Sequence, residues 1–171
     1  VTHDFSGNPL SFQGASFVAM ERDKMLAGQP AGVVRFSGFD AYGTQPIHLD
    51  GTLKARDGAC PTFVHFDAAD SSYLFWDMCL NWTTPANSTI SANPQRVLSS
   101  IPIRPNFADI PQLGSSFPLD SFGQNIMYRA AARAYDAGAP YTTSLVINHA
   151  VLGPVDQSAI KWVHFDLKQG V

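Results

Sequence analysis

Apolar and polar residues alternate along several short runs of this chain, which predicts β-strands. A valine, a basic residue and a phenylalanine follow one another at residues 34–36, 64–66 and 163–165. Two of these copies extend to a longer aromatic–polar alternation, over residues 63–67 and 162–166. A period of two is typical of a half-buried strand. Because the phrase recurs, we expect a repeated sheet unit.

Turn-forming residues divide the chain into further runs. Residues 62–67 and 73–80, joined by a short polar connector, predict a β-hairpin. Residues 22–28 predict one or two helical turns that Gly28 and Pro30 end. The other expected strands cover residues 16–21, 32–39, 95–103, 142–151 and 159–167, with a brief pairing at residues 46–50.

The run at residues 125–135 admits two interpretations. Its position among strand-like runs favours a strand, whereas its many alanines make a helix the alternative on propensity alone. Taking it as a strand, we predict an all-β fold of antiparallel sheets arranged as propeller blades, with a β-sandwich as the alternative. Residues 1–171 would form a single β-rich domain or an incomplete propeller segment of a larger chain.

Composition supports a folded, strand-rich chain and excludes two classes of partner. Hydrophobic residues make up 45% of the 171 residues and charged residues only 15%, against about 25% in an average soluble domain. Net charge is −3 with no basic tract, so we expect no nucleic-acid partner. No apolar run reaches the roughly 18 residues of a membrane span, so none is expected.

The two cysteines and two sequons favour an extracellular compartment. Cys60 and Cys79 lie in or beside the two runs of the predicted hairpin, so we expect a disulfide between them, with two free buried thiols as the alternative. Such a bridge would stabilise the fold by about 3 kcal/mol. Asn81-Trp82-Thr83 and Asn87-Ser88-Thr89 are N-glycosylation acceptor patterns, which place Asn81 and Asn87 on surface loops of a secreted protein.

Three His-x-Asp pairs are the first candidates for chemistry, at residues 48–50, 65–67 and 164–166. Residues i and i+2 of a strand share a face, so each pair suits two metal ligands or an acid–base couple. The favoured interpretation is that His and Asp lie on the solvent face while the residue between them points into the core. We therefore assign no metal site.

Four further residues are candidates for ligand binding. Arg129 and Arg133 share a face if their run is a strand, and paired guanidinium groups would bind the carboxylate of an acidic sugar. The competing interpretation is a structural ion pair with Asp120 or Asp136. His149 is a possible general base, although such a histidine more often packs against a backbone carbonyl. The ligand-binding candidates are thus Asp120, Arg129, Arg133 and His149; no catalytic residue and no cofactor are assigned.

Several phrases resemble a widespread group of large secreted microbial proteins with a β-propeller-like domain. They lie at residues 21–30, 81–89, 120–123, 126–129, 145–151 and 160–162 and so extend over nearly the whole chain. The resemblance implies a secreted β-rich domain. It implies no reaction, because no activity is established for the group.

Together these observations favour a non-enzymatic secreted domain for extracellular binding or assembly. Open sheet edges would invite pairing with another chain or with copies of the same chain. The first alternative is a carbohydrate-binding lectin or a glycan-processing hydrolase, with glycans as partners. The second is a structural subunit of an extracellular filament.

Overall fold

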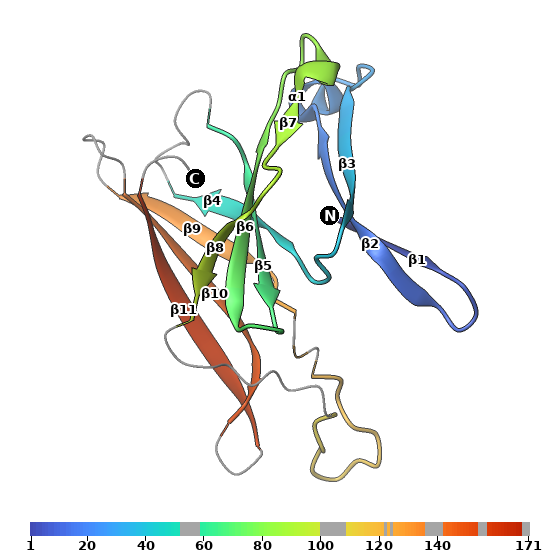
Figure 1. Ribbon diagram of the computed structural model, residues 1–171, viewed down its shortest axis with the longest axis vertical. Helices are drawn as coiled ribbons and strands as arrows, with labels where there is room; N and C mark the ends of the chain where they lie inside the picture. Colours follow the sequence, from blue (N-terminus) through green and yellow to red (C-terminus); the bar gives the residue numbers. More distant parts are fainter. Residues whose placement is uncertain are drawn as a thin grey trace.

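The computed structural model describes residues 1–51, 59–99, 109–121, 123, 125–135, 142–153 and 157–168. Strands dominate this part of the chain, with one short α-helix and one 3-10 turn (Figure 1). In chain order the elements are β1 (Thr2–Ser6), β2 (Ser11–Met20), α1 (Arg22–Leu26), β3 (Val33–Phe39), β4 (Gln45–Asp50), β5 (Thr62–Asp67), β6 (Ser72–Cys79), η1 (Pro85–Asn87), β7 (Thr89–Ile90), β8 (Gln95–Leu98), β9 (Ala130–Tyr135), β10 (Thr142–Leu152) and β11 (Ser158–Lys168).

The strands form two sheets. β1, β2 and β3 make a three-stranded antiparallel sheet, and the other eight form a sheet in the order β11-β10-β9-β4-β5-β6-β7, with β8 also paired to β6. The larger sheet curls strongly, so that in Figure 1 β9 crosses behind β5 and β6 while β10 and β11 run toward the lower left of them. The predicted all-β class is confirmed.

The arrangement of the strands differs from the predicted succession of propeller blades. β4 pairs in parallel with β9, with Ile47 opposite Ala130 and Asp50 opposite Arg133. This pairing joins an early strand to a late one and makes a single continuous sheet of segments that separate blades would keep apart. The recurring valine–basic–phenylalanine phrase therefore marks strand segments, in β3, β5 and β11, that are not equivalent strands of a repeated unit.

The β5–β6 hairpin is buried on both faces, because it lies between two hydrophobic clusters. On the inner face of the curled sheet, Val64 and Phe66 pack with residues of β9 and β10. On the opposite face, Phe63 and Trp76 pack with residues of β2 and β3. A strand covered on both faces needs apolar side chains at nearly every position, which explains the burial of β5 up to its last residue and of most of β6.

The alanine-rich run forms a strand, β9, and not the alternative helix. Ala130, Ala132 and Ala134 are buried while the residues between them are more exposed. The small methyl groups of the buried alanines let β9 lie close to the inner cluster, between β4 and β10. Burial and two strand neighbours outweigh the helix propensity of alanine here.

The three-stranded sheet packs on the outer face of β5 and β6. Phe17 stacks on Phe63, with ring centroids 4.6 Å apart and planes inclined by 10°. In this region the chain has the two-layer packing that the β-sandwich alternative predicts. α1 follows β2, as expected from residues 22–28, and the ring of Trp82 lies beside Gly32 at the same end of the layer. Within the described residues, no helix has the length and apolar character needed to cross a bilayer.

Candidate binding pocket

A cavity of about 430 Å³ opens where the three-stranded sheet meets the end of the β5–β6 hairpin. Its volume is within the range of small-molecule sites. β1 and β2 supply one wall, the β3–β4 connection another, and the end of β5 with its turn the third. The lining residues are Phe5, Phe12, Asp40, Tyr42, His65, Phe66, Asp67, Ala68 and Ala69.

Three aromatic rings form one side of the pocket. The ring centroids of Phe12 and Tyr42 lie 5.3 Å apart and those of Phe5 and Phe12 lie 5.9 Å apart, with steep interplanar angles of 76° and 64°. Such edge-to-face contacts are the favoured geometry of aromatic pairs. Phe5 remains 48% exposed. The cluster thus presents apolar ring surface to whatever enters the pocket.

Local contacts fix Tyr42 in this cluster. The backbone N–H of Gly43 donates to Nε2 of His3, at 3.2 Å, and the His3 ring lies 5.1 Å from that of Tyr42. Gly43 has a φ of +78°, and a Cβ at that position would collide with Asn125. Only glycine satisfies both conditions, so the turn that presents Tyr42 depends on this residue.

Two carboxylates, Asp40 and Asp67, also line the pocket. Asp67 is held in place, because its Oδ1 accepts from the N–H of Ala69 at 3.0 Å and its Oδ2 lies 3.4 Å from a guanidinium nitrogen of Arg96. Within the described part of the chain, Asp40 has neither an ion pair nor a hydrogen bond through its side chain. The described lining contains no Lys or Arg.

His65 lies in the pocket wall and is only 7% exposed. Desolvation by burial lowers its pKa, while the charges of Asp67 and Asp40 and a hydrogen bond to the backbone of Tyr42 act in the opposite direction. Its Nδ1 is buried without a hydrogen-bond partner among the described residues. The expectation that His65 lies on a solvent face is therefore wrong, because β5 is covered on both faces.

The other two His-x-Asp pairs do lie on a solvent-facing surface of the large sheet, where His48 and His164 are exposed. His164 Nε2 lies 2.6 Å from Ser144 Oγ and 3.4 Å from Asp166 Oδ1. Both contacts use the same ring nitrogen, whereas a catalytic triad needs the hydroxyl and the carboxylate on different nitrogens. Within the described residues, no three His, Cys, Asp or Glu side chains gather as a metal site requires.

His149 is fully buried inside the curled sheet, and the pocket is not lined by it. Its Nδ1 lies 3.3 Å from the carbonyl oxygen of Ala150, to which only an N–H can donate, and its Nε2 lies 2.9 Å from the hydroxyl of Tyr73. Nε2 must then accept from the Tyr73 O–H. Burial lowers the pKa of His149 and raises that of Tyr73. The pair is a satisfied polar contact within the core.

The structure does not bring the four predicted ligand-binding residues together. Arg129 pairs with Asp50, at 3.0 Å, which is a different partner from the predicted Asp120 or Asp136. Arg133 is exposed on β9, and Asp120 is exposed in the loop that precedes Ser121. Asp136 lies outside the described residues. A ligand-binding role for Asp120, Arg129, Arg133 and His149 stays a prediction.

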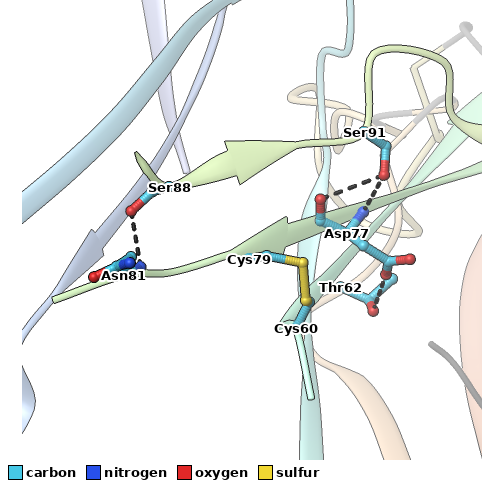
Figure 2. Close-up of a disulfide and its surroundings, with 7 residues drawn as sticks. All are labelled: Cys60, Thr62, Asp77, Cys79, Asn81, Ser88 and Ser91. Atoms are coloured by element: carbon cyan, nitrogen blue, oxygen red, sulfur yellow. Dashed lines mark hydrogen bonds between the residues drawn. A yellow bond between two sulfur atoms is a disulfide. The ribbon is translucent and has the colours of Figure 1, made fainter. Parts of the chain in front are cut away.

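The predicted disulfide between Cys60 and Cys79 is confirmed, and Figure 2 shows it joining the segment before β5 to the end of β6. The Cα atoms of the two cysteines are 4.5 Å apart. Asn81 follows directly, where its N–H donates to Ser88 Oγ at 2.9 Å and its Oδ1 accepts from the N–H of Thr84 at 2.8 Å. Asn81 and Asn87 are both exposed, as glycan acceptors must be.

Reasoning from the sequence missed the wall of the pocket that Phe5 and Phe12 form, because it did not assign the first fifteen residues. A signal was present. Two short runs flank a Gly7-Asn8-Pro9 turn, and Phe5 and Phe12 occupy the strands on either side of it. Turn residues between apolar-alternating runs predict a hairpin. That hairpin, β1–β2, carries two of the three rings.

Comparison with protein-family profiles, with curated proteins and with solved structures found no match to this chain. The resemblance to secreted propeller-like proteins accordingly stays a prediction.

Proposed function

We propose that this chain is a secreted, non-enzymatic binding domain that holds its ligand in the pocket between the two sheets. The observation that carries the proposal is the combination of exposed aromatic surface, at Phe5, with ionisable and polar groups, at Asp40 and His65, around one cavity. An apolar cavity with a few convergent polar groups is the usual form of a ligand site. The rings provide contact area, and the polar groups provide orientation.

Secretion is supported by features at one end of the β6–β7 hairpin. The Cys60–Cys79 disulfide belongs to oxidising compartments. Two exposed sequon asparagines, Asn81 and Asn87, follow within a few residues of it. A bridge and two acceptor sites so close together fit a surface that matures in a secretory pathway.

A ligand titration monitored by amide chemical shifts tests the binding proposal. We expect members of a panel of neutral saccharides and small organic amines to shift the signals of Tyr42, His65 and Ala68 first, because these residues surround the cavity. Tyr42→Ala should weaken such binding about tenfold. Tyr135→Ala, which removes an exposed ring from β9, should leave it unchanged. Shifts confined to other surfaces would contradict the proposed site.

The same titration addresses the lectin and hydrolase alternative. Aromatic rings beside carboxylates also suit a sugar, whose C–H face stacks on the ring while its hydroxyls donate to the carboxylates. Binding of a saccharide without turnover would favour the lectin. Release of a cleaved product would contradict the non-enzymatic part of the proposal.

Self-assembly is a second candidate function, and the free edge of the large sheet favours it. β11 is the last strand of that sheet and pairs only with β10 among the described residues. One face of β11 carries two exposed apolar side chains, Trp162 at 64% and Ile160 at 53% exposure. A long strand edge with exposed apolar side chains is a template for pairing with another chain. The occupant that we propose is β11 of a second copy.

Antiparallel pairing of two β11 strands about Val163 would place Trp162 opposite His164 and Ile160 opposite Asp166. No two like charges would face each other, and the pairing would close a two-fold dimer. A filament would need a second, different surface, such as the outer edge of β1 or of β3.

The mass of the protein in native solution tests self-assembly. We expect a dimer that Trp162→Lys converts to a monomer, because a charge on the paired edge disfavours it. Leu113→Lys, at another exposed apolar position in the 109–121 loop, serves as the matched control and should leave the dimer intact. A wild-type monomer over the whole accessible concentration range would rule this candidate out.

A further inference from the structure

We infer that the pocket selects an organic ammonium group, such as a quaternary amine or a methylated lysine side chain, over a neutral ligand of the same shape. The inference rests on the proposed binding function and deepens it. It follows from two properties of the described lining: its charge and its ring surface.

The charge of the lining is negative and incompletely neutralised. Asp67 shares the guanidinium of Arg96 with Asp70, which also contacts it. Asp40 has no such partner among the described residues. His65 adds no stable positive charge, because burial lowers its pKa. A cation that entered the pocket would therefore meet at least one carboxylate that lacks a counter-ion.

The cost of removing water from Asp40 depends on the charge of the ligand that replaces this water. A neutral ligand that covers the pocket would remove water from Asp40 without replacing it by an opposite charge, and burial of an unpaired carboxylate is costly. An ammonium group would supply the missing charge in the same step. An anionic ligand would be opposed by both carboxylates.

The rings of Phe5, Phe12 and Tyr42 provide the second contribution. A cation is attracted to the face of an aromatic ring when it lies within about 6 Å of the centroid. The rings are mutually inclined by 64° to 82°, so their faces point in different directions. A roughly spherical group such as trimethylammonium contacts inclined faces better than a flat ligand does.

Choline and 3,3-dimethylbutan-1-ol form a matched pair of probes, because they share a shape and a hydroxyl and differ in charge. We expect amide-shift titrations at low salt to give at least tenfold tighter binding of choline. Asp40→Asn should reduce that preference about tenfold. Asp23→Asn, which removes the same charge from α1, should preserve it, since that side chain is exposed and does not line the pocket.

Phe5→Leu provides a second variant in case Asp40→Asn disturbs the β3–β4 connection. Phe5 is half exposed, so the fold should tolerate leucine, and unchanged amide signals in β10 and β11 would verify this. We expect choline affinity to fall severalfold while the affinity for the neutral alcohol changes little, because only the cation uses the ring face.

Four results would overturn the inference, and they separate it from the proposed function. Equal affinity for both probes, or saccharide binding at the pocket with no choline binding, would remove the ammonium specificity and leave the binding site in place. Binding of choline that is insensitive to both variants would place the ammonium elsewhere. Absence of any pocket shift with choline and with the whole panel would remove both proposals.

Discussion

The hydrogen bond between Tyr73 and His149 joins β6 to β10 across the interior of the curled sheet. Both side chains are almost fully buried, and the His149 ring stacks on Phe66 at a centroid distance of 4.2 Å. A buried acceptor that loses its only donor retains its full desolvation cost. The contact therefore stabilises the fold mainly because, without it, Nε2 of His149 would be buried with no hydrogen-bond donor.

We expect Tyr73→Phe to lower the free energy of unfolding by about 1–3 kcal/mol, because Nε2 of His149 would lose its partner without any loss of ring packing. Chemical denaturation of the purified protein measures the change. Tyr135→Phe removes a hydroxyl from a half-exposed tyrosine of β9 and should have an effect within about 0.5 kcal/mol. Equal effects of the two variants would show that the buried contact contributes nothing.

The buried histidines also predict how stability depends on pH. Burial lowers the pKa values of His65 and His149 from the ordinary 6.5. Between pH 6.5 and the lowered values, the unfolded chain binds protons that the folded chain does not. The free energy of unfolding is therefore highest above pH 6.5, and it decreases as the pH falls below that value.

Denaturant midpoints measured from about pH 7.5 to about pH 5 should show this decline. The slope should become shallower in His149→Gln, because one of the groups that takes up a proton on unfolding is removed. His48→Gln, at an exposed position, should keep the wild-type slope. A stability that rises toward acid in this range would contradict the argument.

The burial of individual residues was harder to predict than the strands that contain them. The histidine of the phrase at residues 64–66 and that of the phrase at residues 163–165 occupy the same sequence context. His65 is buried and His164 is exposed, because β5 is covered by the three-stranded sheet and β11 is not. A period of two in the sequence indicates which residues share a face of the strand. Whether another layer covers that face depends on the tertiary fold, which the period does not indicate.

Among the elements, the β5–β6 hairpin is fixed at both ends. At the open end the Cys60–Cys79 bridge spans a sequence separation of 19 residues, and Thr62 Oγ1 donates to Asp77 Oδ1 at 2.6 Å (Figure 2). At the turn, Arg96 of β8 contacts Asp67 and Asp70. The hairpin is therefore well suited to support the cavity at its turn.

Replacing both cysteines, in a Cys60→Ser and Cys79→Ser double variant, should lower the free energy of unfolding by about 3 kcal/mol. The loss arises mainly because the unfolded chain regains the freedom that the bridge removes. Denaturation curves of the double variant and of the wild type under reducing conditions should agree. A wild type whose stability does not respond to reduction would contradict the prediction.

Local elements could be predicted from the sequence, whereas their pairing could not. The turn-flanked runs of β3, β5 and β6 and the short helix α1 were identified near their observed bounds, because periodicity and Gly or Pro signals are local. The parallel pairing of β4 with β9 was not foreseen, since no local signal connects segments so far apart. A separate long-range contact brings Asp40 and Tyr42 to Phe5, which is why the pocket could not be assembled from spacing alone.

At the scale of the whole molecule, the exposed asparagines beside the disulfide test the compartment. Expression through a eukaryotic secretory pathway should add glycan mass at Asn81 and at Asn87, and Asn81→Gln and Asn87→Gln should each remove one increment. Thr83→Ala destroys the first sequon without altering its asparagine and should match Asn81→Gln. Intact-mass spectrometry distinguishes these products, and an unmodified wild type would weaken the case for secretion.

The parallel ladder between β4 and β9 has a consequence for biosynthesis. When β4 emerges from the ribosome, the strand that completes its outer side has not yet been translated. Contacts between distant segments also slow folding, because a large loop must close before they form. Until β9 is available, the amide and carbonyl groups on one edge of β4 have no strand to pair with. A chaperone would be most useful to the nascent chain during that interval.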